Sequence, residues 1–149
     1  MATWSGIKAK LENEYLAESL RGRIQYFATT YRESHDREGR AAILCDGKEI
    51  LRGAYYNTFA PLWEYKDIDD TALREGAFDQ RSFYEAFAEF DNQSIDKSLQ
   101  SNNLLVRIFA ILDRRVGKRR LLAMKGDISV QPAAFRMFYD IRAKAEKIY

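Results

Sequence analysis

Hydrophobic residues at the start of the chain recur every three to five positions, which is the spacing of one face of an α-helix. Thr3 or Ser5 can cap the N-terminus of this helix, because a side-chain oxygen there accepts a hydrogen bond from a backbone amide. Gly22 stands where the left-handed residue after a helix is expected. The apolar face of the predicted N-terminal helix consists of Trp4, Ile7, Leu11, Tyr15 and Leu20.

Three short runs of β-forming residues follow this helix. They cover residues 24–31, 41–45 and 49–52, and Asp46-Gly47 joins the second run to the third. Asp-Gly between two apolar runs is typical of a type I′ hairpin, because both turn residues need a positive φ. We therefore expect a three-stranded antiparallel meander over about residues 23–52.

The C-terminal half of the chain favours helices. Residues 53–78 show no clear pattern, although Pro61 argues against a central strand there. No repeat or flexible linker interrupts the chain, so we expect one α+β domain over residues 1–149, with an N-terminal helix, a small three-stranded antiparallel sheet and a helical C-terminal half. The predicted C-terminal helices cover residues 80–90 (capped by Asp79), 94–101, 104 to about 117 and 132–148.

Composition excludes several classes of function. The chain of 149 residues has one cysteine, Cys45, and one histidine, His35, so a disulfide framework and a Cys- or His-rich metal site are excluded. Neither a signal peptide nor an apolar stretch of membrane-spanning length is present, so we expect a cytoplasmic protein. No glycine-rich phosphate loop or calcium loop is present, and we expect neither cofactor nor metal.

Charge is unevenly distributed along the chain. Residues 1–65 carry 9 basic and 9 acidic side chains, residues 66–101 carry 4 and 9, and residues 102–149 carry 11 and 4. The net charges are therefore 0, −5 and +7, which sum to +2. Either the two charged segments neutralise each other in the fold, or the basic segment meets an acidic partner.

The strongest basic feature is residues 114–120, of which five are cationic. One interpretation is structural: cations gather at a helix C-terminus, and Asp113 pairs with a neighbouring arginine. The other is that guanidinium groups contact phosphates. A pI near 8.6 is low for a nucleic-acid-binding protein, and no helix-turn-helix, zinc-finger or RNP pattern accompanies the cluster.

A second candidate is the polar loop around Ser34-His35-Asp36. Adjacent residues rarely form a catalytic triad, but His35 could act as a general acid or base while Arg32 and Arg40 hold a phosphate. The alternative is a loop whose side chains bond to nearby backbone amides. Cys45 lies in an apolar run, so we expect a buried and unreactive thiol.

Two stretches of the sequence stand out together. They are Ser19-Leu20-Arg21-Gly22-Arg23-Ile24-Gln25-Tyr26, with Tyr31-Arg32-Glu33-Ser34-His35-Asp36 and Gly39-Arg40, and Leu112-Asp113-Arg114-Arg115-Val116-Gly117-Lys118-Arg119-Arg120-Leu121. With them the chain resembles a family of short bacterial cytosolic proteins that has no established activity. This family begins with a Trp-Ser helix and ends in an aromatic-rich helix, and the likeness covers most of the chain except about residues 53–78. The resemblance implies a bacterial source and a stand-alone domain, and it transfers no catalytic residues.

The function predicted from these patterns is binding rather than catalysis, by a basic and aromatic surface that takes an anionic ligand or a protein partner. This hypothesis requires the two arginine-bearing stretches to lie side by side, with His35 near Arg115. The alternatives are nucleic-acid binding through residues 114–120, an enzyme that uses His35 on a phosphorylated small molecule, and a partner-binding protein with an exposed apolar patch around Trp63 and Tyr55-Tyr56. The residues assigned to the surface are Arg21, Arg23, Tyr31, Arg32, His35, Arg40, Arg114, Arg115, Lys118, Arg119 and Arg120.

Overall fold

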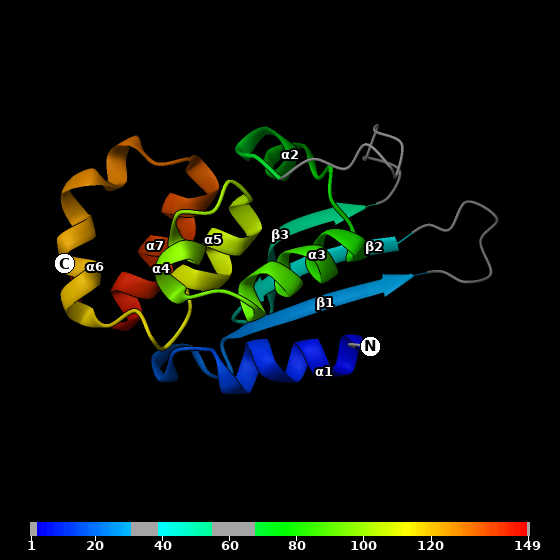
Figure 1. Ribbon diagram of the computed structural model, residues 1–149, viewed down its shortest axis with the longest axis horizontal. Coiled ribbons are helices and arrows are strands. Elements are labelled where there is room, and N and C mark those ends of the chain that lie inside the picture. The colour runs from blue at the N-terminus through cyan, green and yellow to red at the C-terminus, as the bar shows by residue number, and fades with distance from the viewer. Residues whose placement is uncertain (1–2, 31–38, 55–67, 149) are drawn as a thin grey trace.

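The computed structural model describes residues 3–30, 39–54 and 68–148 of the chain. It confirms the α+β class: an N-terminal helix, a three-stranded antiparallel sheet and a helical C-terminal half (Figure 1). The elements are α1 (Trp4–Ala9), the π-helical turn η1 (Lys10–Glu14), the 3₁₀ turn η2 (Glu18–Leu20), β1 (Ile24–Thr30), β2 (Gly39–Cys45), β3 (Lys48–Ala54), α2 (Asp70–Glu75), α3 (Gln80–Asp91), α4 (Ile95–Leu99), α5 (Leu104–Ile111), α6 (Lys118–Met124), the 3₁₀ segment η5 (Lys125–Val130) and α7 (Ala133–Ala145).

The N-terminal helix begins as predicted but ends earlier. Thr3 caps α1, because its hydroxyl oxygen accepts a hydrogen bond from the amide of Gly6 at 3.2 Å. Helical backbone continues only through η1, and the amide of Ala17 donates instead to the carbonyl of Leu112 at 2.9 Å. Gly22 has the positive φ of +80° that its position suggests, but it belongs to the turn before β1 rather than to a helix end. Pairing with a distant segment therefore shortens the helix.

The predicted meander is confirmed. The strands pair antiparallel in the order β1-β2-β3, with Ile24 opposite Cys45 in the first pair. Asp46 and Gly47 have φ values of +52° and +83°, which are the two positive angles that a type I′ turn requires. The register between β2 and β3 shifts at Ile43/Leu44, as in a β-bulge.

Two side chains of the N-terminal helix bind the outer edge of β1. Glu12 accepts a hydrogen bond from the amide of Tyr26 at 2.8 Å, and the Lys8 ammonium donates to the Tyr26 carbonyl at 2.7 Å. Lys8 and Glu12 also pair with each other. An unpaired strand edge invites association with other chains, and this charged pair blocks that pairing at Tyr26.

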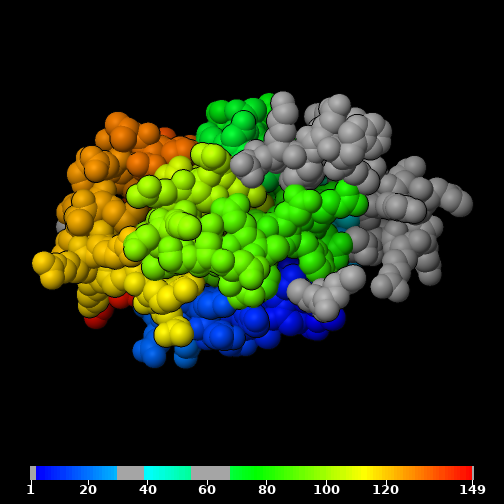
Figure 2. Space-filling view, in the orientation of Figure 1, coloured from blue at the N-terminus to red at the C-terminus, as the bar shows by residue number. Residues whose placement is uncertain are grey.

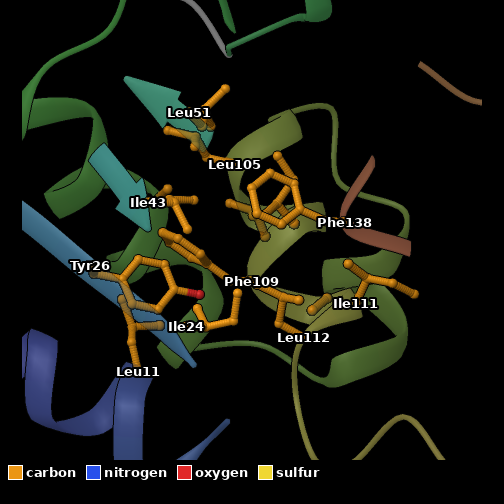
Figure 3. Packing of buried hydrophobic residues seen from close by; sticks show 14 of the residues in the cluster. Leu11, Ile24, Tyr26, Ile43, Leu51, Leu105, Phe109, Ile111, Leu112 and Phe138 are labelled. Atoms are coloured by element: carbon orange, nitrogen blue, oxygen red, sulfur yellow. The ribbon is translucent and has the colours of Figure 1, made fainter. Parts of the chain in front are cut away.

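The core lies between one face of the sheet and the helices α3, α5 and α7. Along β1, the buried residues Ile24, Tyr26 and Ala28 alternate with more exposed ones, as in a sheet with one face in the core. Tyr26 meets Phe109 edge to face at 5.6 Å, and Phe109 meets Phe83 in the same way at 6.1 Å. Figure 3 shows Phe109 among Ile24, Tyr26 and Ile43 of the strands and Phe138 of α7.

The four predicted C-terminal helices are confirmed as α3, α4, α5 and α7. However, α5 ends at Ile111 rather than near Gly117, because residues 112–114 pair with the segment before η2. Asp79 caps α3 through a reciprocal capping box with Ser82, and Pro132 stands one position earlier than expected, at the cap of α7. The sequence pattern predicts neither α2 nor α6. Each of these helices buries one hydrophobic residue, Leu73 in α2 and Leu121 in α6, so neither has an apolar stripe that a periodicity analysis can detect.

Candidate functional site

The basic residues 114–120 lie in a loop and helix that are anchored by a buried arginine. Arg142 of α7, only 3% exposed, donates hydrogen bonds to the carbonyls of Ile111 and Asp113 at 3.0 and 2.8 Å, and to the carbonyl of Val116. The last carbonyls of a helix have no partner within that helix, and here one guanidinium serves the end of α5 and the loop that follows it. Burial lowers the pKa of Arg142, and the nearby carboxylate of Glu146 opposes this effect.

Glu146 connects this anchor to the N-terminal part of the chain. It accepts a hydrogen bond from the Ser19 hydroxyl at 2.6 Å and pairs with the Arg142 Nε at 3.2 Å. Burial alone would raise the pKa of Glu146, but the Ser19 hydrogen bond and the Arg142 and Lys118 charges bring it below its ordinary value. The end of α7 therefore holds η2 and the basic loop together.

Residues 112–114 also pair directly with residues 14–17. Leu16 and Asp113 form an isolated antiparallel bridge, and the amide of Arg114 donates to the carbonyl of Tyr15 at 2.7 Å. The Arg114 Nε reaches the carbonyl of Glu14 at 2.8 Å. The backbone of the basic loop is thus held on both sides, by α7 and by the segment before η2.

Asp113 pairs with a neighbouring arginine, as the structural interpretation of the cluster predicts. Its carboxylate is buried and accepts two hydrogen bonds from the Arg115 guanidinium, at 3.0 and 2.9 Å. The guanidinium also lies over the rings of Tyr15 and Phe90, at 5.1 and 5.6 Å. Burial and a hydrogen bond to Asp91 raise the pKa of Tyr15 to about 12, so the phenol stays protonated and donates to the Asp91 carboxylate.

The rest of the cluster does not follow the structural interpretation. That interpretation places the cations at a helix C-terminus, where the partial negative charge of the helix favours them. Gly117 instead caps the N-terminus of α6, so Lys118, Arg119 and Arg120 form its first turn. Positive charges there oppose the helix dipole, at a cost of roughly 0.3–1 kcal/mol each. Helix stability therefore does not explain these three cations.

Three predicted site arginines have carboxylate partners elsewhere. Arg23 makes a double hydrogen bond to Asp46, which lowers the pKa of that carboxyl, and Arg120 pairs with Asp96 at 2.6 Å. Arg40 pairs with Glu49 and lies over the ring of Phe27. Arg23 directly precedes the first residue of β1, whereas Arg40 of β2 is paired with Thr29, the sixth residue of β1. About 20 Å of strand therefore separates Arg23 from Arg40.

Four exposed cations remain around the anchored loop, and we call them the basic surface. Arg21 follows η2, Arg114 lies in the loop, and Lys118 and Arg119 begin α6. None of the four has an ion-pair partner closer than 4 Å among the described carboxylates. The basic surface consists of Arg21, Arg114, Lys118 and Arg119.

Several candidate residues lie outside the described part of the chain. These are the loop residues Tyr31, Arg32 and His35 and the aromatic residues Tyr55, Tyr56 and Trp63. The distance from His35 to Arg115 and the hypothesis of catalysis by His35 therefore stay predictions. Cys45 is buried as expected, and burial together with the Asp46 carboxylate raises the pKa of its thiol.

The sequence analysis missed Arg142, the residue that organises the site. Its signal is present: Arg142 stands three and four positions from Tyr139 and Phe138, on the face of α7 that also buries Phe135. A single arginine within an apolar helical face must find several acceptors when it is buried, so this spacing indicates a structural guanidinium.

Metal ligands and membrane-spanning helices are not features of the described residues. No three His, Cys, Asp or Glu side chains lie close enough there to hold a metal ion. Within the same ranges, every helix is too short or too polar to cross a bilayer.

Neither a curated protein nor a solved structure matches the chain. A family model does match, over residues 3–143, and the chain therefore belongs to the SF0329 protein family.

Proposed function

We propose that this chain is a binding protein that holds an acidic segment of a protein partner on the basic surface. The observation that supports this most strongly is the first turn of α6, where Lys118, Arg119 and Arg120 oppose the helix dipole. Residues that cost stability at an exposed position are typical of functional surfaces. Carboxylates of a partner would pair with Lys118 and Arg119, which have no ion-pair partner closer than 4 Å among the described carboxylates.

The anchored backbone suits this role. Arg142 and the Leu16–Asp113 bridge fix the loop before α6, so the exposed cations lie on a backbone that needs no ordering when a partner binds. A surface that is already ordered loses less conformational entropy on association. The buried Arg142 thus serves binding indirectly, by positioning Arg114 and the start of α6.

A protein partner fits the charge pattern better than a nucleic acid. Nucleic-acid binding depends on many phosphate contacts along a continuous basic track. Here the exposed carboxylates Glu14 and Glu18 lie in the same region as Arg21, and the net charge of the whole chain is only +2. Mixed charge of this kind favours a partner with a defined arrangement of acidic and basic groups. A cytoplasmic, bacterial setting, which the resemblance implies, agrees with a single reduced thiol.

The test is fluorescence anisotropy with a labelled peptide of alternating glutamate and alanine as the acidic probe. The test variant combines Arg114→Glu, Lys118→Glu and Arg119→Glu. A matched control combines Lys48→Glu, Arg52→Glu and Arg136→Glu, three exposed cations elsewhere on the molecule whose reversal gives the same change of net charge.

The proposal expects the wild-type chain and the control variant to bind the peptide alike, and the test variant to bind roughly tenfold or more weakly. Glutamate in the first turn of α6 favours the helix dipole, but Arg114→Glu removes the hydrogen bond to the Glu14 carbonyl, so Tm is measured for each variant and binding is compared below the lowest Tm. Equal binding by the two variants would overturn the proposal. If a labelled single-stranded oligonucleotide binds more tightly than the peptide, and the test variant loses this binding, nucleic-acid binding would replace the proposed function.

A further inference from the structure

A pocket of about 290 Å³ opens between the end of α4, α6 and η5, on the side of α6 away from Lys118 and Leu122. Both walls lie on the face shown in Figure 2, with α4 in green to yellow-green and α6 with η5 in yellow to orange. Small-molecule sites usually measure roughly 300–1,000 Å³, so this pocket suits a small ligand. It is lined by Leu99, Gln100, Arg120, Ala123, Met124, Asp127, Ile128 and Gln131.

Half of the lining residues are apolar. Leu99 of α4 faces Ala123 and Met124 of α6 across the pocket, and Ile128 of η5 joins them. Methionine has a flexible, unbranched side chain that adapts to irregular shapes. This part of the pocket can therefore take an aliphatic chain or a ring.

Arg120 supplies the positive charge of the pocket. Its guanidinium pairs with Asp96 at 2.6 Å, and the two side chains are 42% and 73% exposed. An ion pair this exposed contributes roughly 0–1 kcal/mol, so the carboxylate of a ligand can replace Asp96 at little cost. A guanidinium also matches a carboxylate with two parallel hydrogen bonds.

The remaining polar groups limit the charge and the position of a ligand. Asp127 lies in the same lining, and its negative charge disfavours phosphates and other ligands with several negative charges. Gln131 accepts a hydrogen bond from Arg107, whose guanidinium lies over Phe135 at 4.6 Å. With its oxygen engaged, the Gln131 amide presents its N–H donors to a further acceptor.

We propose that this pocket binds a small amphiphilic monocarboxylate, that is, a molecule with an apolar body and a single carboxylate. The body lies against Leu99, Met124 and Ile128, and the carboxylate pairs with Arg120 in place of Asp96. None of the pocket-lining residues belongs to the basic surface, so binding to the pocket and binding to the basic surface can be tested independently.

Octanoate is a suitable probe, followed by two-dimensional amide NMR of the full chain. The proposal expects saturable shifts centred on the amides of Ala123, Met124 and Ile128, with weaker binding of the uncharged analogue octanamide. Ala123→Trp, which fills the pocket from an exposed position, should abolish these shifts. Arg120→Gln should weaken binding by up to about fivefold, the most that an ion pair this exposed contributes.

Arg136→Gln is the matched control, because it removes the same charge at an exposed position of α7 outside the pocket. It should bind octanoate like the wild-type chain. The proposal is overturned by shifts that do not saturate, by shifts centred on other residues, or by equal weakening in Arg136→Gln and Arg120→Gln. The triple reversal at Arg114, Lys118 and Arg119 retains Arg120, so octanoate binding in that variant separates the pocket from the proposed function.

Discussion

Replacing Arg142 with methionine tests whether one buried guanidinium holds the loop between α5 and α6. Methionine has a similar length and keeps the apolar contacts of the arginine stem, but it donates no hydrogen bond. The change removes the donors to the carbonyls of Ile111, Asp113 and Val116. It also removes the ion-pair partner of Glu146, which keeps its hydrogen bond from Ser19.

The expected loss follows from these contacts. A buried polar group that loses its partner costs about 1–3 kcal/mol, and breaking a buried ion pair costs about 3–5 kcal/mol. The carbonyls in the loop can recover part of this by binding water, because Arg114 and Arg115 beside them are exposed. We therefore expect Arg142→Met to lower the free energy of unfolding by about 3–5 kcal/mol, or Tm by roughly 10–20 °C for a chain of this size.

The measurement is urea unfolding followed by circular dichroism and tryptophan fluorescence. Trp4 stacks on Phe83 at 5.9 Å, so its fluorescence reports packing of α1 on the core, away from the substituted position. Arg136→Met is the control, since Arg136 is exposed on the same helix, and it should change stability by less than about 0.5 kcal/mol. Arg142→Lys should fall between the two, because an ammonium lacks the planar fork that reaches several carbonyls. Equal stability of Arg142→Met and Arg136→Met would refute the role given to this guanidinium.

Two further substitutions test other parts of the fold. Gly53→Ala should destabilise the protein by about 1–3 kcal/mol in thermal unfolding, because a Cβ would lie 2.3 Å from the carbonyl oxygen of Phe78, whereas Gly126→Ala meets nothing within 4 Å and should be nearly neutral. Glu146→Gln should lower the free energy of unfolding at neutral pH. The pKa of Glu146 is lowered in the fold, so its ionised carboxylate stabilises the protein fully above its ordinary pKa of 4.5. This stabilisation disappears as the pH falls through the lower pKa of the folded state. A pH-independent difference between Glu146→Gln and the wild-type chain in urea unfolding would contradict the assigned pairing with Arg142.

The elements that sequence analysis predicts well are those with a local cause. Asp46-Gly47 forms its turn because of backbone angles that only a few residue types adopt, and Asp79 begins α3 because its carboxylate reaches nearby amides. The apolar stripe of α5 is equally local. In contrast, the first helix ends where Ala17 pairs with Leu112, a contact across most of the chain, and no pattern near Ala17 indicates it.

The same distinction applies to the site. The pairing of Asp113 with a neighbouring arginine is local, and the sequence predicts it correctly. The role of Arg142 depends on carbonyls of α5 and of the loop after it, which only the tertiary fold brings to α7. The orientation of Lys118 depends on Gly117 acting as an N-cap, and without an apolar stripe in α6 the glycine looks like the end of the preceding helix.

Ion pairs within the fold neutralise only part of the opposite charges of the acidic residues 66–101 and the basic residues 102–149. Arg120 and Asp96 join the two segments, but Arg115 and Arg142 take Asp113 and Glu146, acceptors from their own segment. Asp70 pairs with Arg74 inside the acidic segment, and Asp91 takes Lys10 from the N-terminal helix. Positive charge therefore stays exposed at the start of α6, where it opposes the helix dipole, and it raises the local potential for an acidic partner. Because those cations are exposed, binding there should weaken steeply with salt, whereas the pocket beside Arg120 relies on one charge and an apolar wall and should respond much less.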